Sequence, residues 1–162
     1  MAGFTLIELV ITVAIVGLIA TVAFPMAELA VQRSKERDLR DALQQIRTAI
    51  DAYKQAVDEK RIIPGASSGH LGQVPSAFPP NLQVLVDGVD DAKSAQVGQK
   101  IYFLRRMPRD PFFDDPTQAA DATWGKRSYA SPPEAPAEGD DVFDIYSLSS
   151  GVGMNGIPYK QW

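Results

Sequence analysis

The sequence contains no cysteine and only one histidine, His70. Without cysteine the chain can form no disulfide scaffold, thiol nucleophile, cysteine-ligated zinc site or iron–sulfur cluster. A single imidazole excludes any site that needs two histidines. Acidic residues outnumber basic residues by 20 to 16, and the net charge of −4 disfavours a general nucleic-acid binder. These absences remove most enzyme classes, and we expect no metal site and no cofactor.

Charge is almost missing from the start of the chain. Residues 1–31 contain no Lys or Arg and only two acids, Glu8 and Glu28, and the 19 residues from Leu9 to Ala27 carry no charge. A helix of that length reaches about 28 Å, close to the thickness of the hydrocarbon core. We therefore predict a transmembrane helix over residues 4–27. A cleaved secretory signal is less consistent, because the start carries no basic side chain and Glu8 interrupts the apolar run.

Residues 28–61 are predicted to form an amphipathic helix. Apolar residues recur at spacings of 4, 3, 4, 3 and 4, which places them along one helical stripe that alanines widen. No proline lies between Pro25 and Pro64, so this helix can continue directly from the membrane segment. Pro25 is expected to kink the junction because it removes a backbone donor. The stripe consists of Leu39, Leu43, Ile46, Ile50, Tyr53 and Val57, with Ala42, Ala49 and Ala56 beside it.

Residues 62–162 hold 11 of the 12 prolines and are predicted to form a globular part. A short helix is expected over 81–87, stopped by Gly88, and extended segments over 101–104, 128–131 and 141–148. In the last segment, Phe143, Ile145 and Leu148 are expected to share one face. A helix followed by a small antiparallel sheet is an α+β pattern, and we expect the apolar stripe to cover that sheet.

Glu8 is a lone carboxylate near the head of the predicted membrane helix. An acid in the bilayer costs about 2.5–3.5 kcal/mol on insertion scales, so it usually has a partner. The simpler interpretation is that Glu8 lies at the interface and reaches water. No basic side chain precedes Arg33, so a strong partner has to be a freed α-amino group or another molecule.

The segment from Gly3 to Val10, Gly-Phe-Thr-Leu-Ile-Glu-Leu-Val, resembles the N-terminal signature of type IV pilin-like proteins. The resemblance implies that residues 1–3 are a leader, that a prepilin peptidase cuts after Gly3 and that Phe4 becomes the N-methylated terminus. It also implies that Glu8 is the assembly acid and that Pro25 is the proline of the family's helix. Glu8 of one subunit could then pair with the Phe4 amine of the next, which offsets the desolvation of both.

Later segments resemble the major pseudopilins of type II secretion systems: Phe78 to Val86, Met107 to Phe112, Trp124-Gly125 with Ser128-Tyr129, and Asp141 to Leu148. The resemblance implies a structural, non-enzymatic subunit of a filament that drives protein export. Its implied partners are its own copies, minor pseudopilins, an inner-membrane assembly platform and the prepilin peptidase. The implied location is a single pass of the inner membrane with the C-terminal part in the periplasm. A true type IV pilus subunit for adhesion or motility is the alternative, and a membrane-anchored periplasmic domain is a third.

Two features depart from that family's pattern. The loop of residues 149–156 contains no acid, so it lacks the carboxylate ligands that calcium prefers, and no calcium site is carried over. The leader has no Lys or Arg, whereas Arg33, Lys35 and Arg37 follow the apolar run. Taken alone, the positive-inside rule predicts the opposite orientation, which an upstream start would reconcile.

The remaining polar and aromatic clusters are expected to be structural or solvated. No Gly-x-Ser-x-Gly setting or phosphate-binding glycine loop is present, so an enzyme is not expected. His70 is expected in an exposed loop. The basic run of Arg105, Arg106 and Arg109 is expected to be solvated on the surface. The alternative is that this run contacts acidic residues of a neighbouring subunit. Solvated turns are expected for two acidic groups: Asp110, Asp114 and Asp115, and Asp140, Asp141 and Asp144. Packing roles are expected for Trp124 and Tyr129, and for Tyr159 with Trp162 at the C-terminus.

Overall fold

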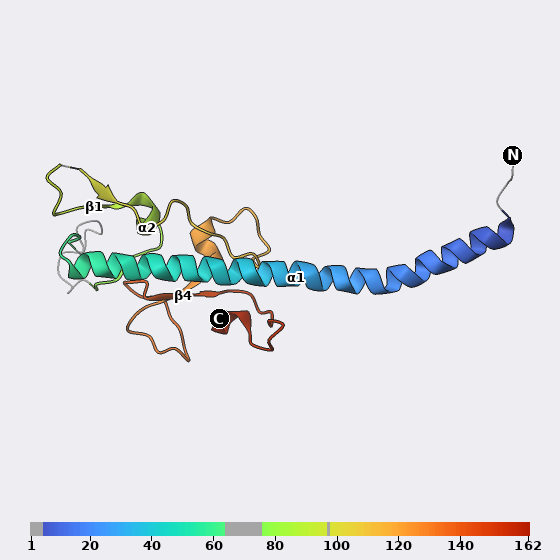
Figure 1. Cartoon of the computed structure of the whole chain (residues 1–162). Helices are drawn as coiled ribbons and strands as arrows, with labels where there is room; N and C mark the ends of the chain where they lie inside the picture. Colours follow the sequence, from blue (N-terminus) through green and yellow to red (C-terminus); the bar gives the residue numbers. More distant parts are fainter. Residues whose placement is uncertain (1–4, 64–75, 97) are drawn as a thin grey trace. The chain divides into compact units, whose positions relative to one another are not determined.

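The computed structural model describes residues 5–63, 76–96 and 98–162, without the side chains of Val22 and Pro25. The chain divides into two compact units, Met1–Arg37 and Asp38–Trp162. The first helix, α1 (Leu6–Asp58), is 53 residues long and passes from the first unit into the second (Figure 1). Its backbone stays helical through position 25, and the kink expected at Pro25 stays a prediction.

In the second unit, α1 contributes the predicted apolar stripe to the core. Leu39 and Ile46 are fully buried, Leu43 and Ile50 nearly so, and Tyr53 is 4% exposed. The three alanines beside the stripe are also buried, and Val57 is partly buried against the same core. The spacing of apolar residues alone therefore identified the face of α1 that packs on the rest of the unit.

The helix ends at Asp58, three residues before the predicted end, because the chain turns into a left-handed conformation at Lys60 (φ 57°). The Lys60 N–H donates to the Val57 carbonyl (2.8 Å) and the Arg61 N–H to the Ala56 carbonyl (2.8 Å). This pair of bonds is a Schellman motif, which satisfies carbonyls that the last helical turn leaves unpaired. Lys60 occupies a position that glycine usually fills.

A short helix and a two-stranded hairpin follow. Helix α2 spans Val84–Asp87 rather than 81–87, and the Asn81 side chain ahead of it accepts a hydrogen bond from the Val84 N–H (3.0 Å). Gly88 (φ 74°) lets the chain leave the helix next to the Tyr102 ring. Strands β1 (Val89–Asp90) and β2 (Lys100–Ile101) then pair antiparallel, so only the start of the predicted 101–104 segment is strand.

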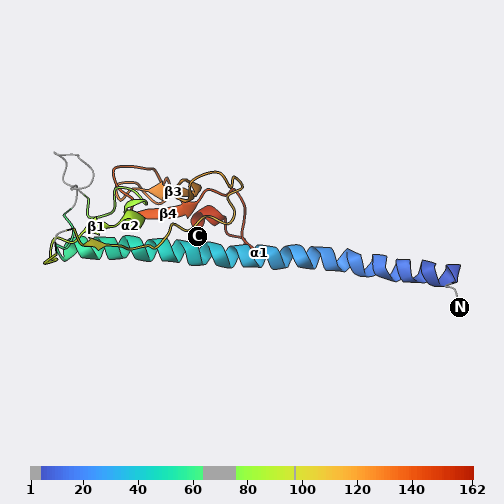
Figure 2. The same ribbon diagram turned by 90° about the horizontal axis from the view of Figure 1, so that it is seen from above.

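The main sheet pairs β3 (Trp124–Arg127) with β4 (Asp144–Ser147), antiparallel, with Trp124 opposite Ser147. A short 3₁₀ turn, Ala120–Thr123, precedes β3, and another, Tyr159–Gln161, follows β4. Figure 2 shows β3 and β4 lying along the second-unit part of α1. Within the described residues the elements are one long helix and small antiparallel sheets, so the predicted α+β class is confirmed.

Two strand predictions were wrong in detail. Residues 128–131 form a turn, in which the Ser131 N–H donates to the Ser128 carbonyl (3.1 Å), and the strand is the four residues before it. In the 141–148 segment only residues 144–147 are strand. Ile145 faces the core as predicted, but Ser147 shares its face and Leu148 is 48% exposed.

Candidate functional site: the N-terminal segment and its folded support

The first turn of α1 begins at a polar cap. The Glu8 N–H donates to the Thr5 carbonyl (3.1 Å) and lies 3.4 Å from the Thr5 hydroxyl oxygen. Thr5 and Glu8 have the spacing of a capping box, of which the structure shows only the bond from the Glu8 main-chain N–H to Thr5. An anionic side chain in the first turn also interacts favourably with the helix dipole. Glu8 therefore has a local structural role in addition to any role in assembly.

The segment around and after Glu8 exposes its apolar side chains. Leu6 is 82% exposed, Val16 65% and Leu18 72%, and the most apolar 18-residue window of α1 has a mean hydropathy of 2.6 with no residue buried. By length and composition, this helix could cross a membrane. Apolar surface on this scale needs lipid or other helices to cover it, because a soluble chain rarely leaves such a patch in water.

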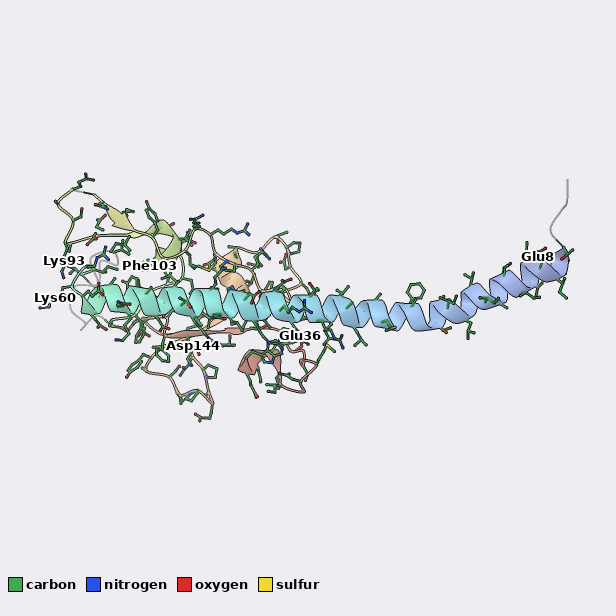
Figure 3. The ribbon with its side chains drawn as sticks, viewed as in Figure 1. Glu8, Glu36, Lys60, Lys93, Phe103 and Asp144 are labelled. Atoms are coloured by element: carbon green, nitrogen blue, oxygen red, sulfur yellow. The ribbon has the colours of Figure 1, made fainter. Side chains whose placement is uncertain are left out.

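The hydroxyl groups of the segment are compatible with that apolar environment. The Thr12 hydroxyl donates to the carbonyls of Glu8 (3.0 Å) and Leu9 (2.9 Å), and the Thr21 hydroxyl donates to the Leu18 carbonyl (2.7 Å). Such bonds satisfy the hydroxyls within the helix. Among the described residues, none donates a hydrogen bond to the Glu8 carboxylate or forms an ion pair with it. Figure 3 shows Glu8 near the N-terminal end of α1.

Of the four predicted site residues, the structure describes Glu8 and the backbone of Pro25. Gly3 and Phe4, the predicted cleavage and methylation positions, lie outside the described residues, as does His70. Glu8 is in the first turn of α1, and position 25 lies within the same helix. Glu8 and position 25 are therefore well separated along one helix.

Asp110 in the second unit was predicted to be solvated, and this prediction was wrong. Its side chain is 2% exposed and accepts hydrogen bonds from the Ser147 hydroxyl (2.5 Å) and from the Phe112 N–H (2.8 Å). Asp114 and Asp115 are exposed, as expected. Asp110 thus ties its loop to strand β4, and its burial is tolerated because both contacts are polar.

Asp141 was also predicted to be solvated and is buried, at 6% exposure. It accepts hydrogen bonds from the Ser128 hydroxyl (2.6 Å), the Tyr129 N–H (3.0 Å) and the Ser76 hydroxyl. One carboxylate therefore joins three segments that are far apart in sequence. These bonds also explain why residues 128–131 turn instead of continuing strand β3.

Arg47 links α1 to strand β4 and to the C-terminal residues. Its guanidinium donates to Asp144 (2.8 Å), to the Ile145 carbonyl (3.1 Å) and to the Trp162 main-chain oxygen (2.8 Å). Asp144, labelled in Figure 3, also lies 3.6 Å from Arg127. Charge-assisted bonds of this kind are stronger than neutral ones, so they fix the register between the helix and the sheet.

The predicted aromatic packing is confirmed for three of the four residues. Trp124 is 1% exposed and donates to the Pro108 carbonyl (2.9 Å), and Tyr159, which stacks on Phe112, is 3% exposed. Trp162 lies partly buried against the core. Tyr129 is 67% exposed but packs against Phe78 and Phe143.

The three arginines of the basic run do not share one environment. Arg105 and Arg106 are exposed, as expected for a solvated run. Arg109 instead donates to the carbonyls of Asp115 (2.7 Å) and Gln118, and so braces its own loop. Across residues 5–63, 76–96 and 98–162, no three His, Cys, Asp or Glu side chains are grouped so that they could hold a metal ion.

Replacing Ser147 with alanine is expected to destabilise the second unit by about 1–3 kcal/mol, because it removes a donor from the buried Asp110 carboxylate. Ser150→Ala is the matched control, since Ser150 is exposed and only three residues away. Urea unfolding followed by tryptophan fluorescence measures both variants. Equal stability of the two variants would contradict the assigned role of Ser147.

The end of α1 is held by a pH-dependent ion pair. Arg61 and Asp91 are 2.6 Å apart, and the hydrogen bond from Arg61 lowers the pKa of Asp91 from its ordinary value of 3.8. The stabilisation is therefore fully present above pH 3.8 and is lost as the pH falls through the lowered pKa. Asp91→Asn should reduce the melting temperature at neutral pH, and the difference from wild type should shrink in stronger acid. Asp90→Asn is the control, and its melting temperature at neutral pH should stay close to that of the wild type, because Asp90 is exposed.

Comparison with known proteins gives one match, at the N-terminus. Residues 1–24 match the family model described as the prokaryotic N-terminal methylation motif. Curated proteins and solved structures gave no match. The matched residues include the cap, Glu8 and most of the exposed apolar segment.

The motif indicates the class of type IV pilins and pseudopilins, whose members are structural subunits rather than enzymes. The long N-terminal helix and small antiparallel sheets are a pilin-like architecture. The motif also implies processing by a prepilin peptidase, and the apolar helix is consistent with membrane anchoring and pilin-like polymerisation.

Proposed function

We propose that the chain is a structural subunit of a type II secretion pseudopilus, which polymerises through its N-terminal helix and drives protein export across the outer membrane. The observation that carries the proposal is a methylation motif at the head of an apolar helix whose side chains are unburied. That surface needs a partner, and helices of further copies can cover it and the Glu8 carboxylate together.

In this proposal Gly3 precedes the cleavage point and Phe4 becomes the N-methylated terminus. The new α-amine of Phe4 is a cation in an apolar setting, and Glu8 of a neighbouring subunit is its partner. Pro25 removes one backbone donor from the helix within the packed filament core, and there it is expected to kink the helix. The small side chains of Ala14, Gly17, Ala20 and Ala23 favour close approach of neighbouring helices.

Three features of the second unit support a pseudopilin over a pilus subunit. Helix α2, the loop containing Asp110 and strand β4 fall in the segments that resemble major pseudopilins. The absence of cysteine agrees, since many pilins close their C-terminal region with a disulfide. The proposed partners are minor pseudopilins and an inner-membrane assembly platform, with the second unit in the periplasm.

Deletion of the gene in its own host tests the proposal. We expect proteins destined for export to accumulate in the periplasm, with surface filaments and motility unchanged. Wild-type chain supplied in trans should restore export. Loss of surface filaments or motility with normal export would contradict the pseudopilus and favour a type IV pilus.

A further inference from the structure

The C-terminal hairpin, residues 151–158, displays apolar side chains on a fixed main chain. Val152 bridges to Pro158, the Gly153 N–H donates to the Ile157 carbonyl (2.9 Å), and Gly156 (φ 79°) closes the turn. Val152 is nevertheless 52% exposed and Ile157 44% exposed. Met154, on the same hairpin, is 42% exposed, and exposed apolar side chains grouped in this way indicate a contact surface.

The hairpin is attached to one flank of α1. Trp162 donates from its indole N–H to the Ile157 carbonyl (3.2 Å), and the Arg40 guanidinium lies 4.3 Å from the Trp162 ring centroid. Arg47, two turns further along α1, binds the Trp162 main-chain oxygen. The hairpin therefore lies on the flank of the helix that carries Arg40 and Arg47.

A groove of ≈ 430 Å³ lies elsewhere on the same helix. One wall is a face of α1 whose residues recur at spacings of 4, 3 and 4, from Asp41 to Ala52. The other wall is the chain just after β2. This face of α1 points roughly 120° away from the Arg40 and Arg47 flank, at about 100° per residue. Figure 3 shows Phe103 on the opposite side of α1 from the C-terminus marked in Figure 1. The walls include Asp41, Gln45, Thr48 and Ala52 from α1, and Phe103 and Leu104.

The geometry points to a contact between copies: we propose that the C-terminal hairpin of one copy docks in this groove of the next copy. A chain's own hairpin is separated from its groove by α1, so the occupant is a second molecule. The charges are complementary, since Lys160 is the only charged residue in 149–162 and Asp41 is the only charged residue in the groove wall. The inference rests on the proposed polymer.

The two surfaces are different patches of the same molecule, so the contact is heterologous. A docked pair then keeps one free hairpin on one copy and one free groove on the other, and such a contact builds an open series instead of a closed dimer. That is the property a filament subunit needs. Ala52, which is exposed, and Phe103, which is partly buried, supply the apolar surface that Val152 and Ile157 would cover, with the Lys160 to Asp41 pair at the rim.

The cysteine-free chain allows a direct test by disulfide cross-linking. The full chain carrying Ile157→Cys and Thr48→Cys is produced in host membranes with the prepilin peptidase and then oxidised. Because the pair is heterologous, a ladder of dimers, trimers and larger species is expected, whereas either cysteine alone gives at most dimers. Ile157→Cys with Glu138→Cys is the control, since Glu138 is exposed and lies outside the groove; it should give no ladder.

A charge exchange tests the rim contact separately. In the two-cysteine chain, Lys160→Asp or Asp41→Lys alone should reduce the ladder roughly two- to fivefold, as expected for an exposed ion pair. The two changes together should restore it. Failure of the double exchange to restore the ladder would contradict the proposed orientation.

A cysteine in the first unit separates this inference from the proposed function. Val16→Cys, on the exposed apolar segment, should give dimers if the N-terminal helices pack together. Dimers from Val16→Cys without a ladder from the groove pair would overturn the docking contact and leave the pseudopilus proposal intact. Loss of both products would contradict both.

Discussion

Replacing Glu8 with glutamine is expected to abolish assembly of the chain into filaments. In the proposed polymer the Glu8 carboxylate pairs with the Phe4 amine of a neighbour, and the substitution leaves that cation without its partner in an apolar core. A loss of about 2–3 kcal/mol at each contact corresponds to a roughly 30–150-fold fall in the association constant. Every subunit makes the contact, so the effect on filament yield is large.

Glutamine is the informative substitution because it separates two roles of Glu8. A capping box accepts Glu or Gln at this position, so Glu8→Gln keeps the cap with Thr5 and removes only the charge. Glu8→Asp, which keeps the charge, is the matched control and should retain more assembly. The measurement is filament yield by electron microscopy of sheared cells, with membrane insertion checked by fractionation. Wild-type yield from Glu8→Gln would show that Glu8 serves only the helix start.

The second large effect is expected in the folded unit. Ile46 is fully buried at the centre of the apolar stripe, between Leu43 and Ile50. Ile46→Ala removes its packing and leaves a cavity, which costs about 2–5 kcal/mol. That is a large share of the roughly 5–15 kcal/mol that stabilises an ordinary domain. We therefore expect the variant to be unfolded or degraded before it can assemble.

Thr48→Ala is the control for this prediction, because Thr48 is exposed on the same helix two residues later. Its stability should stay within about 0.5 kcal/mol of wild type. Tryptophan fluorescence in urea measures both variants, since Trp124 and Trp162 both lie in the second unit. Equal midpoints for the two variants would contradict the assignment of the stripe to the core.

The features predicted correctly from the sequence depend on local pattern. The stripe of α1 follows from the period of its apolar residues, and every member of it is buried or partly buried. The exposed apolar segment follows from an uncharged run, and the methylation motif from a few adjacent residues. Each of these signals lies within one helix, where the chain's period determines which side chains share a face.

The features predicted wrongly depend on contacts between distant residues. Ser128 lies in a turn because its hydroxyl binds Asp141, and nothing in the adjacent sequence indicates that bond. Strand β3 was missed because Trp-Gly-Lys-Arg lacks alternating apolar residues, and Gly125 is needed where the Tyr146 ring packs closely. The Asp110 carboxylate is buried with a hydrogen bond from the Ser147 hydroxyl, which lies 37 positions away in the sequence. The only signal for this burial in the adjacent sequence is that Asp110 is followed by a proline and an aromatic residue.

The proposed function requires that the chain is a prepilin peptidase substrate and that it assembles through Phe4 and Glu8. The most direct test is the intact mass of the full chain from membranes with and without the peptidase. We predict loss of Met1, Ala2 and Gly3 and gain of one methyl group only when the peptidase is present. An unprocessed chain in both preparations would contradict the account, because Glu8 would then lack the Phe4 amine as its partner.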